Sequence, residues 1–343
     1  MTTRIALASF AHVHAASYAE LLRDRPDVEL LTCDEPLAPY GDGEVRGAEL
    51  AASLGVNYVS TYEELFAWEP DGVIVCAENS LHRPLTERAA AAGASVLCEK
   101  PLATTVADAE AMIRACQDAG VFLMTAYPVR FAPQFQALRN VADAGELGEL
   151  LAATGTNNGK IPVGARAWFT DPEFSGGGAL VDHVVHVADL MDVLLGGQRA
   201  RRVWATTNQI LHRDKPSVPD GVETGGIVTV EYEGGLQLSI DCSWSQPDSA
   251  PVWGGLSLEV IGTGGLARIE PFASRLDGFS EKEGATLWVD YGTDLDADLL
   301  GTFIQGLRTG VAPAPDGKVG LRTLEIVCAA QESARSGQVV TLA

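Results

Sequence analysis

Two side chains that can exchange protons are predicted to lie on one face of a helix near the middle of the chain. Asp182 and His186 are four residues apart in a run made mostly of Val, Leu and Ala, which predicts a helix reaching Leu195. Four residues make about one helical turn, so the carboxylate and the imidazole lie in register, whereas His183 is rotated away from them. Such a pair is costly to bury without a partner, which indicates either an acid–base site or a structural ion pair.

Glycines mark both ends of this helix. Gly176–Gly178 precede it and Gly196-Gly197 follow it. Because glycine has no Cβ, another backbone or a ligand can approach the helix start closely. An imidazole, with an unperturbed pKa of about 6.5, is suited to accept a hydroxyl proton. We expect no metal, because two ligands without further His, Asp or Cys at suitable spacing are too few.

The composition argues against several classes of partner. A formal charge of −22 disfavours binding to nucleic acid or to anionic membranes, which both require Lys/Arg clusters. No signal peptide and no long apolar segment are evident, so we expect no membrane span. The six cysteines lack CxxC spacing, which favours reduced thiols in a cytoplasmic protein.

The length and the pattern of elements predict an α/β chain of two domains. At 343 residues the chain exceeds one typical core. Up to about residue 127, short strands alternate with helices, which predicts βαβ units and a parallel sheet. Residues 128–343 contain longer strands joined by hairpin signals, which predict a mostly antiparallel sheet with one face covered by the central helix. The boundary is expected near Tyr127.

The turn after the first strand is unusual for a nucleotide-binding sheet. Such a turn normally carries three glycines that let backbone amides approach a pyrophosphate, and none of those positions is glycine here. Ser9 and Ala11 are small enough for a phosphate to approach, while His12 and His14 either hydrogen-bond it or only begin a helix. Asp34 ends the second strand, where an acid receives the ribose hydroxyls of NAD. This acid repels a 2′-phosphate and no Arg follows closely, so NAD is favoured over NADP.

Three further motifs carry a family resemblance. The stretches Asn79–His82, Gly93–Leu102 (with Glu-Lys-Pro) and Gly176–His186 (with Gly-Gly-Gly-x-x-x-Asp-x-x-x-His) resemble the Gfo/Idh/MocA oxidoreductases, which include glucose–fructose oxidoreductase and inositol dehydrogenase. The chain departs from the family's pattern in the glycine-free turn and at Glu78, where Pro is usual.

The resemblance implies a fold and a set of site residues. The fold is an N-terminal Rossmann dinucleotide-binding domain, residues 1–127, followed by an α/β substrate-binding and oligomerisation domain, residues 128–343, with an open sheet whose exposed face commonly pairs two subunits. Lys100, Asp182 and His186 match the family's catalytic residues. Together with the strand ends, the resemblance gives the expected cofactor contacts: Ser9, Phe10, Ala11, His12, Asp34, Ala77, Asn79, His82, Glu99 and Lys100.

Substrate contacts are expected mostly from the second domain, where Trp168 either stacks on a sugar or plugs the domain seam. Arg130 is expected to anchor the two domains, and residues 212–224 form either a lid or a surface excursion. The candidate substrate residues are Tyr127, Asn157, Lys160, Arg166, Trp168 and His183.

These observations predict a cytoplasmic, NAD-dependent oxidoreductase that acts on a secondary alcohol or ketone of a sugar, polyol or inositol. We expect a homodimer or homotetramer. The alternative is a non-catalytic regulatory protein that binds dinucleotide and sugar.

Overall fold

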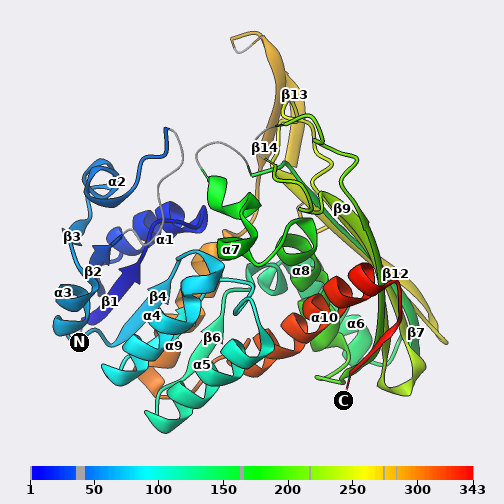
Figure 1. The fold of residues 1–343 in the computed structure, drawn as a ribbon, viewed down its shortest axis with the longest axis horizontal. Helices are drawn as coiled ribbons and strands as arrows, with labels where there is room; N and C mark the ends of the chain where they lie inside the picture. Colours follow the sequence, from blue (N-terminus) through cyan, green and yellow to red (C-terminus); the bar gives the residue numbers. More distant parts are fainter. Residues whose placement is uncertain are drawn as a thin grey trace.

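The computed structural model describes residues 2–35, 43–162, 166–215, 218–272, 275–282 and 284–342. The N-terminal part forms a six-stranded parallel sheet in the order β3-β2-β1-β4-β5-β6, the strand order of a Rossmann domain (Figure 1). Its strands are β1 (Thr3–Ala8), β2 (Val28–Cys33), β3 (Asn57–Val59), β4 (Gly72–Val75), β5 (Ser95–Cys98) and β6 (Leu123–Thr125). The predicted parallel sheet is therefore confirmed.

The helices of this part begin where the sequence supplies caps. Thr61 and Glu64 form a capping box at the start of α3, and the Thr105 side chain accepts a hydrogen bond from the Asp108 N–H. The helices are α1 (His14–Arg23), α2 (Gly47–Leu54), α3 (Tyr62–Ala67), α4 (His82–Ala91) and α5 (Val106–Asp118). The short 3₁₀ helices η1 (Asn79–Leu81) and η2 (Pro128–Phe131) follow strands β4 and β6.

The second sheet has seven strands in the order β12-β11-β7-β10-β9-β8-β15, and only β7 and β10 are parallel. Helices α6, α8 and α10 share one hydrophobic core with its inner face, whereas Trp204, Ile227 and Ile261 are exposed. The predicted open, mostly antiparallel sheet is confirmed. Its strands are β7 (Leu150–Gly159), β8 (Ala200–Asn208), β9 (Gly225–Tyr232), β10 (Gln237–Ser243), β11 (Gly254–Gly262), β12 (Gly265–Ile269) and β15 (Val340–Thr341); the other elements are α6 (Pro133–Asp143), η3 (Ala167–Thr170), α7 (Pro172–Ser175), α8 (Ala179–Leu194), η4 (Glu233–Gly235) and α10 (Gly317–Ser336).

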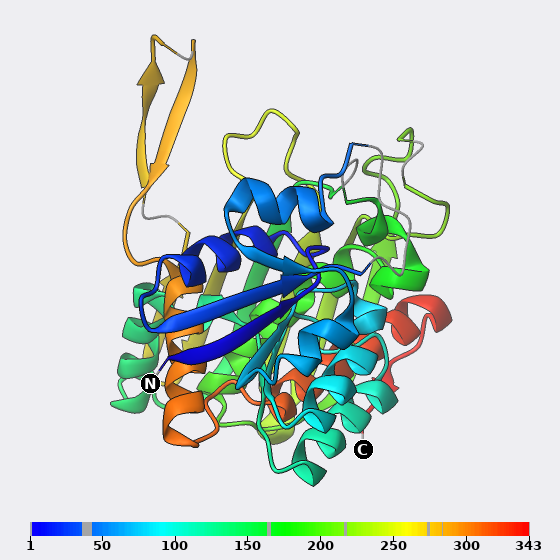
Figure 2. The ribbon, with the colours of Figure 1, turned by 90° about the vertical axis from the view of Figure 1, so that its left-hand side faces the viewer.

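A hairpin that the sequence pattern did not predict projects from the body of the molecule (Figures 1 and 2). Its strands, β13 (Arg275–Ser280) and β14 (Ala285–Asp290), pair only with each other among the described residues. Leu276 and Phe279 are 64% and 89% exposed, so these two side chains do not pack into a hydrophobic core.

Helix α9 (Leu295–Thr309) returns to the first sheet although it follows the second one in sequence (Figure 2). Leu299, Leu300, Phe303 and Ile304 share a core with residues of β1 and α1. The hydrophobic core on one side of the Rossmann sheet is therefore completed by a helix from the C-terminal part of the chain.

None of the helices in the described ranges is both long and apolar enough to cross a membrane. All six cysteines are free thiols, and five of them are buried. This agrees with the expected reduced state.

Candidate active site

The start of helix α8 is held by close backbone contacts. A Cβ on Gly178 would lie 2.1 Å from the carbonyl oxygen of Glu223, and one on Gly176 would lie 2.9 Å from the Thr104 side chain. Glu223 Oε1 also accepts hydrogen bonds from the N–H groups of Gly178 (2.8 Å) and Leu180 (3.3 Å). The glycines therefore permit the close approach that the sequence suggested.

The segment 212–224 supports this helix. Besides capping α8 through Glu223, it places Val218 and Val222 in a small core with Trp244. Residues 216 and 217 lie outside the described ranges. The described part of the segment thus supports the start of the helix. This role favours neither of the two interpretations from the sequence, a lid or a surface excursion.

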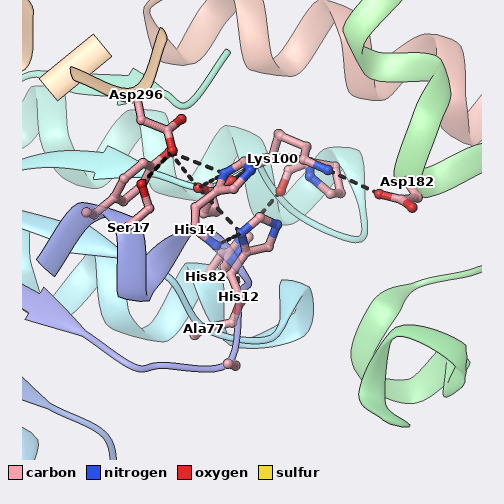
Figure 3. Close-up of polar contacts among 12 residues, drawn as sticks. His12, His14, Ser17, Ala77, His82, Lys100, Asp182 and Asp296 are labelled. Carbon is pink, nitrogen blue, oxygen red and sulfur yellow. Dashed lines mark hydrogen bonds and ion pairs between the residues drawn. The ribbon is translucent and has the colours of Figure 1, made fainter. Parts of the chain in front are cut away.

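Lys100 and Asp182 meet across the seam between the two domains (Figure 3). Lys100 follows β5, its peptide bond to Pro101 is cis, and its Nζ donates to Asp182 Oδ1 at 3.1 Å. Asp182 Oδ2 accepts from Trp244 Nε1 at 3.0 Å. Burial alone would raise the pKa of Asp182, but His183 and Lys100 outweigh it and hold that pKa well below its usual range. The Asp182 carboxylate is therefore ionised at neutral pH.

The partner of Asp182 on its own helix is His183 and not His186. His183 Nε2 lies 3.2 Å from Asp182 Oδ2, the oxygen that also accepts from Trp244 Nε1. His186 Nδ1 is buried without a hydrogen-bond partner among the described residues. Burial and the nearby Lys100 lower the pKa of His186 well below its usual value, so the imidazole is neutral. A neutral imidazole with an unpaired nitrogen can accept a proton.

These groups face a cavity of about 750 Å³. Both halves of the chain contribute: its lining includes His12, His14 and Lys100 from the first part and Asn157, Asp182, His183 and His186 from the second. A cavity of this size and mixed polarity suits a small polar ligand beside the reactive end of a cofactor.

Glu99 belongs to a cluster under this cavity and is not among the residues that line it. Glu99 Oε1 lies 3.0 Å from His14 Nδ1 and 3.6 Å from His12 Nδ1, and it accepts from the Tyr18 hydroxyl at 2.9 Å. Burial lowers the pKa of His12 well below its usual value, whereas Glu99 raises that of His14 despite burial. One possible ligand atom from each of His12, His14 and Glu99 lies within 4.8 Å of the others. The sequence did not predict this grouping, in which Glu99 is held by His14 and Tyr18.

The Asp34 carboxylate already accepts hydrogen bonds from other groups of this chain. It accepts hydrogen bonds from Ser9 Oγ (2.9 Å), from Arg46 Nε (2.9 Å) and Nη2 (2.7 Å), and from the Gly47 N–H (3.1 Å). Arg46 Nη1 also donates to Glu78 at 2.9 Å. The expectation that no Arg lies close to Asp34 is therefore wrong, since Arg46 reaches back from the start of α2.

Two family models match the chain along most of its length. Residues 8–127 match the oxidoreductase family with an NAD-binding Rossmann fold, and residues 135–268 match the GFO/IDH/MocA C-terminal domain. The chain belongs to the Gfo/Idh/MocA oxidoreductase family. The predicted family and the predicted Rossmann domain are both confirmed.

Relatives of this Gfo/Idh/MocA chain include named sugar dehydrogenases. It is 33% identical to 1,5-anhydro-D-fructose reductase of Ensifer adhaerens over 56% of each chain. It is 29% identical to D-xylose 1-dehydrogenase (NADP(+)) 2 of Haloferax volcanii, over 87% of this chain and 89% of that protein. The solved structure of GenD2 from gentamicin A biosynthesis in complex with NAD has the same fold, with a TM-score of 0.86 at 24% identity, covering 100% of this chain and 97% of that one.

The seam between the two domains contains buried polar atoms that a bound dinucleotide would pair with. Four buried polar atoms there have no hydrogen-bond partner among the described residues: His12 Nε2, Asn79 Oδ1, His183 Nδ1 and His186 Nδ1. Buried polar atoms are normally paired, so their presence on both sides of the seam fits a polar ligand bound between the domains.

Several predicted cofactor residues have structural roles. Phe10 is 1% exposed and packs in the core beneath the sheet. Both ring nitrogens of His82 lie near backbone carbonyls, of Pro101 at 3.0 Å and of Ala77 at 3.1 Å, so this ring holds the Lys100–Pro101 turn. The Asn79 side chain donates to the Ser175 carbonyl at 2.8 Å and thereby joins the domains.

The substrate candidates divide into two groups. Asn157 and His183 line the cavity. The other four are directed elsewhere by specific partners: the Tyr127 hydroxyl bonds Thr323 Oγ1 (2.7 Å), Lys160 Nζ donates to the Asp248 carbonyl (3.0 Å), and Arg166 Nη1 and Trp168 Nε1 both donate to the Ala11 carbonyl (2.7 and 3.2 Å). Arg130 pairs with buried Asp189, and both belong to the second part, at η2 and on α8.

Sequence reasoning missed Trp244, Arg46 and Glu223. A signal existed for Trp244, because a buried indole N–H requires an acceptor. No local signal identifies Arg46 or Glu223, since each reaches its partner through the tertiary fold.

Proposed function

We propose that this chain transfers a hydride between a nicotinamide dinucleotide, preferentially NAD, and a secondary alcohol or ketone of a sugar, polyol or inositol. The observation that carries the proposal is the Lys100–Asp182 ion pair, which joins the two domains at 3.1 Å on the wall of the cavity that also contains His186. The substrate class is further supported by the relatives that are named sugar dehydrogenases.

Each of the three residues has a distinct task. His186 is neutral and has an unpaired nitrogen, so it accepts the hydroxyl proton of an alcohol. The Lys100 ammonium stabilises the negative charge that develops on the substrate oxygen. Asp182, fixed by Trp244 and His183, holds Lys100 in place. A bound nicotinamide would supply the hydride acceptor or donor, and Asn79 and Lys100 are the residues near which it would be held.

The preference for NAD rests on charge. Asp34 and Glu78 share Arg46, so the described carboxylates outnumber the cation in this buried group. A 2′-phosphate would add two further negative charges beside them. We therefore expect NAD to bind more tightly than NADP, although Arg46 lies closer than the sequence suggested.

The test is a spectrophotometric assay of NADH formation with inositols, aldoses and polyols, and of NADH consumption with ketoses. Lys100→Met and His186→Ala should each lower turnover at least a hundredfold, because proton transfer and charge stabilisation each contribute about that factor. Binding of NADH should stay near that of the unmodified chain in both variants. His186→Ala should also keep the thermal stability, whereas Lys100→Met should lower it, because it leaves the buried Asp182 carboxylate without the Lys100 ammonium. Near-normal rates in both variants would exclude these roles, whereas dinucleotide and sugar binding without turnover would indicate the regulatory alternative.

We also propose that the chain forms a homodimer or homotetramer through the open face of its seven-stranded sheet. Trp204 and Ile227, on the neighbouring strands β8 and β9, and Ile261, on β11 of the same sheet, are each about 40% exposed.

A further inference from the structure

The turn between β1 and α1 has few free amides with which to bind a phosphate. The N–H groups of Ser9, Ala11 and His12 donate to the Cys33 carbonyl (2.7 Å), Ser9 Oγ (3.1 Å) and the Cys76 carbonyl (2.9 Å). A glycine-rich turn presents such groups to the ligand instead. A ligand phosphate on this turn therefore needs donors from elsewhere.

Arg166, from the second domain, lies over this turn and makes no ion pair within 4.0 Å of a described carboxylate, although Glu44 is near enough to act on its charge. Its Nη1 donates to the Ala11 carbonyl at 2.7 Å, beside the donation from Trp168 Nε1. The residues that the structure describes offer no acceptor for its other N–H groups and no ion pair. A guanidinium has five donors, so most of them remain for a ligand. A half-buried guanidinium that no described carboxylate pairs with directly is unexpected in a chain of charge −22, and it fits an anion-binding role.

His12 supplies a second donor on the same turn. Its Nδ1 accepts the His14 N–H at 3.3 Å, and because burial keeps the ring neutral, its proton lies on Nε2. Nε2 is buried without a partner among the described residues, and His12 lines the cavity. An orphaned, buried N–H donor thus lies on the residue after Ala11, at the turn that a phosphate would approach.

We propose that Arg166 and His12 bind the diphosphate of the dinucleotide and so replace the backbone amides of the missing glycines. This inference rests on the proposed cofactor binding and assigns one part of it to side chains from both domains. Capture of the cofactor would then require the second domain to lie against the turn, as it does through Arg166, Trp168 and Ala11.

Isothermal titration of the full chain with NADH, ADP-ribose and adenosine tests this role. Arg166→Ala should raise the Kd for NADH and ADP-ribose about tenfold or more, since a charge-assisted hydrogen bond contributes about 1.5–3 kcal/mol. Adenosine, which has no phosphate, should bind the variant and the unmodified chain equally. Arg166→Lys should be intermediate because it keeps the charge without the fork of donors. His12→Phe, which keeps a ring but removes the donor, should weaken ADP-ribose binding as well.

Arg139→Ala is the matched control, because Arg139 is a half-exposed arginine on α6 paired with Asp143. It should leave all three affinities unchanged. If Arg166→Ala binds ADP-ribose within twofold of the control, the diphosphate role is wrong while cofactor binding stands. If the unmodified chain binds neither NADH nor NADPH, the proposed function itself fails and this inference with it.

Discussion

At the scale of single residues, Asp182 receives hydrogen bonds from both domains. Lys100 reaches it from the first domain and Trp244 from the second sheet, while His183 lies beside it on α8. Lys100, Asp182 and His186 were predictable because their types recur at fixed spacing in local motifs. Trp244 and the pairing with His183 were not, because they depend on how β10 and the Lys100 loop meet the helix.

Asp182→Asn should destabilise the fold at neutral pH by about 3 kcal/mol, because it leaves the buried Lys100 ammonium without a counter-charge. The folded-state pKa of Asp182 is depressed, so ionisation stabilises the fold above the unfolded value of about 3.9. That contribution is lost as the pH falls below this value toward the folded pKa. Thermal melting should therefore show a deficit at pH 7 that shrinks near pH 3.

The exposed Asp143 provides the comparison, since it pairs with Arg139 at the surface. Asp143→Asn should change stability by less than about 0.5 kcal/mol at either pH. An Asp182→Asn deficit of the same size at pH 7 and pH 3 would contradict the charge argument.

At the scale of elements, the start of helix α8 is positioned by a glycine, which has no side chain to keep a neighbouring backbone away. The backbone of Glu223 occupies the space where a Gly178 side chain would be, and the Glu223 carboxylate caps the helix. The sequence indicated a close approach at this point but not its partner, because Glu223 lies 45 residues further along the chain.

Gly178→Ala should cost about 2–3 kcal/mol, because its Cβ would overlap the Glu223 carbonyl oxygen and the backbone would have to move. Gly301→Ala is the control: Gly301 lies inside α9 with nothing within 4 Å of its Cβ position, so alanine there should stabilise the helix by up to about 1 kcal/mol. Urea unfolding of both variants measures the difference. Equal effects of the two substitutions would show that helix propensity, and not the contact with Glu223, governs the site.

At the scale of the whole molecule, two sheets were predicted correctly, whereas the packing of α9 on the first sheet and the hairpin of β13 and β14 were not. Period-two and helical patterns identify strands and helices, but they do not say which sheet a helix covers. Helix α9 therefore could not be assigned to the first core, and the exposed hairpin of β13 and β14 gave no core-facing pattern.

Trp204→Glu should convert the proposed oligomer into a monomer, because it replaces an exposed indole on the open sheet face, beside the strand that carries Ile227, with a charge. Sedimentation velocity at micromolar concentration measures the change. Leu276→Glu, on the projecting hairpin, is the comparison and should leave the oligomer intact. If Leu276→Glu dissociated the oligomer and Trp204→Glu did not, the interface would lie at the hairpin and not at the open sheet face.

The return of α9 to the first sheet bears on how the protein can be divided. A fragment that ended at Tyr127 would uncover the side of β1 and α1 against which Leu299, Phe303 and Ile304 pack. The break between the two halves in sequence is therefore not a break between two independent folding units. A nucleotide-binding fragment would have to carry residues 295–309, joined by a linker or by circular permutation, to keep its core closed.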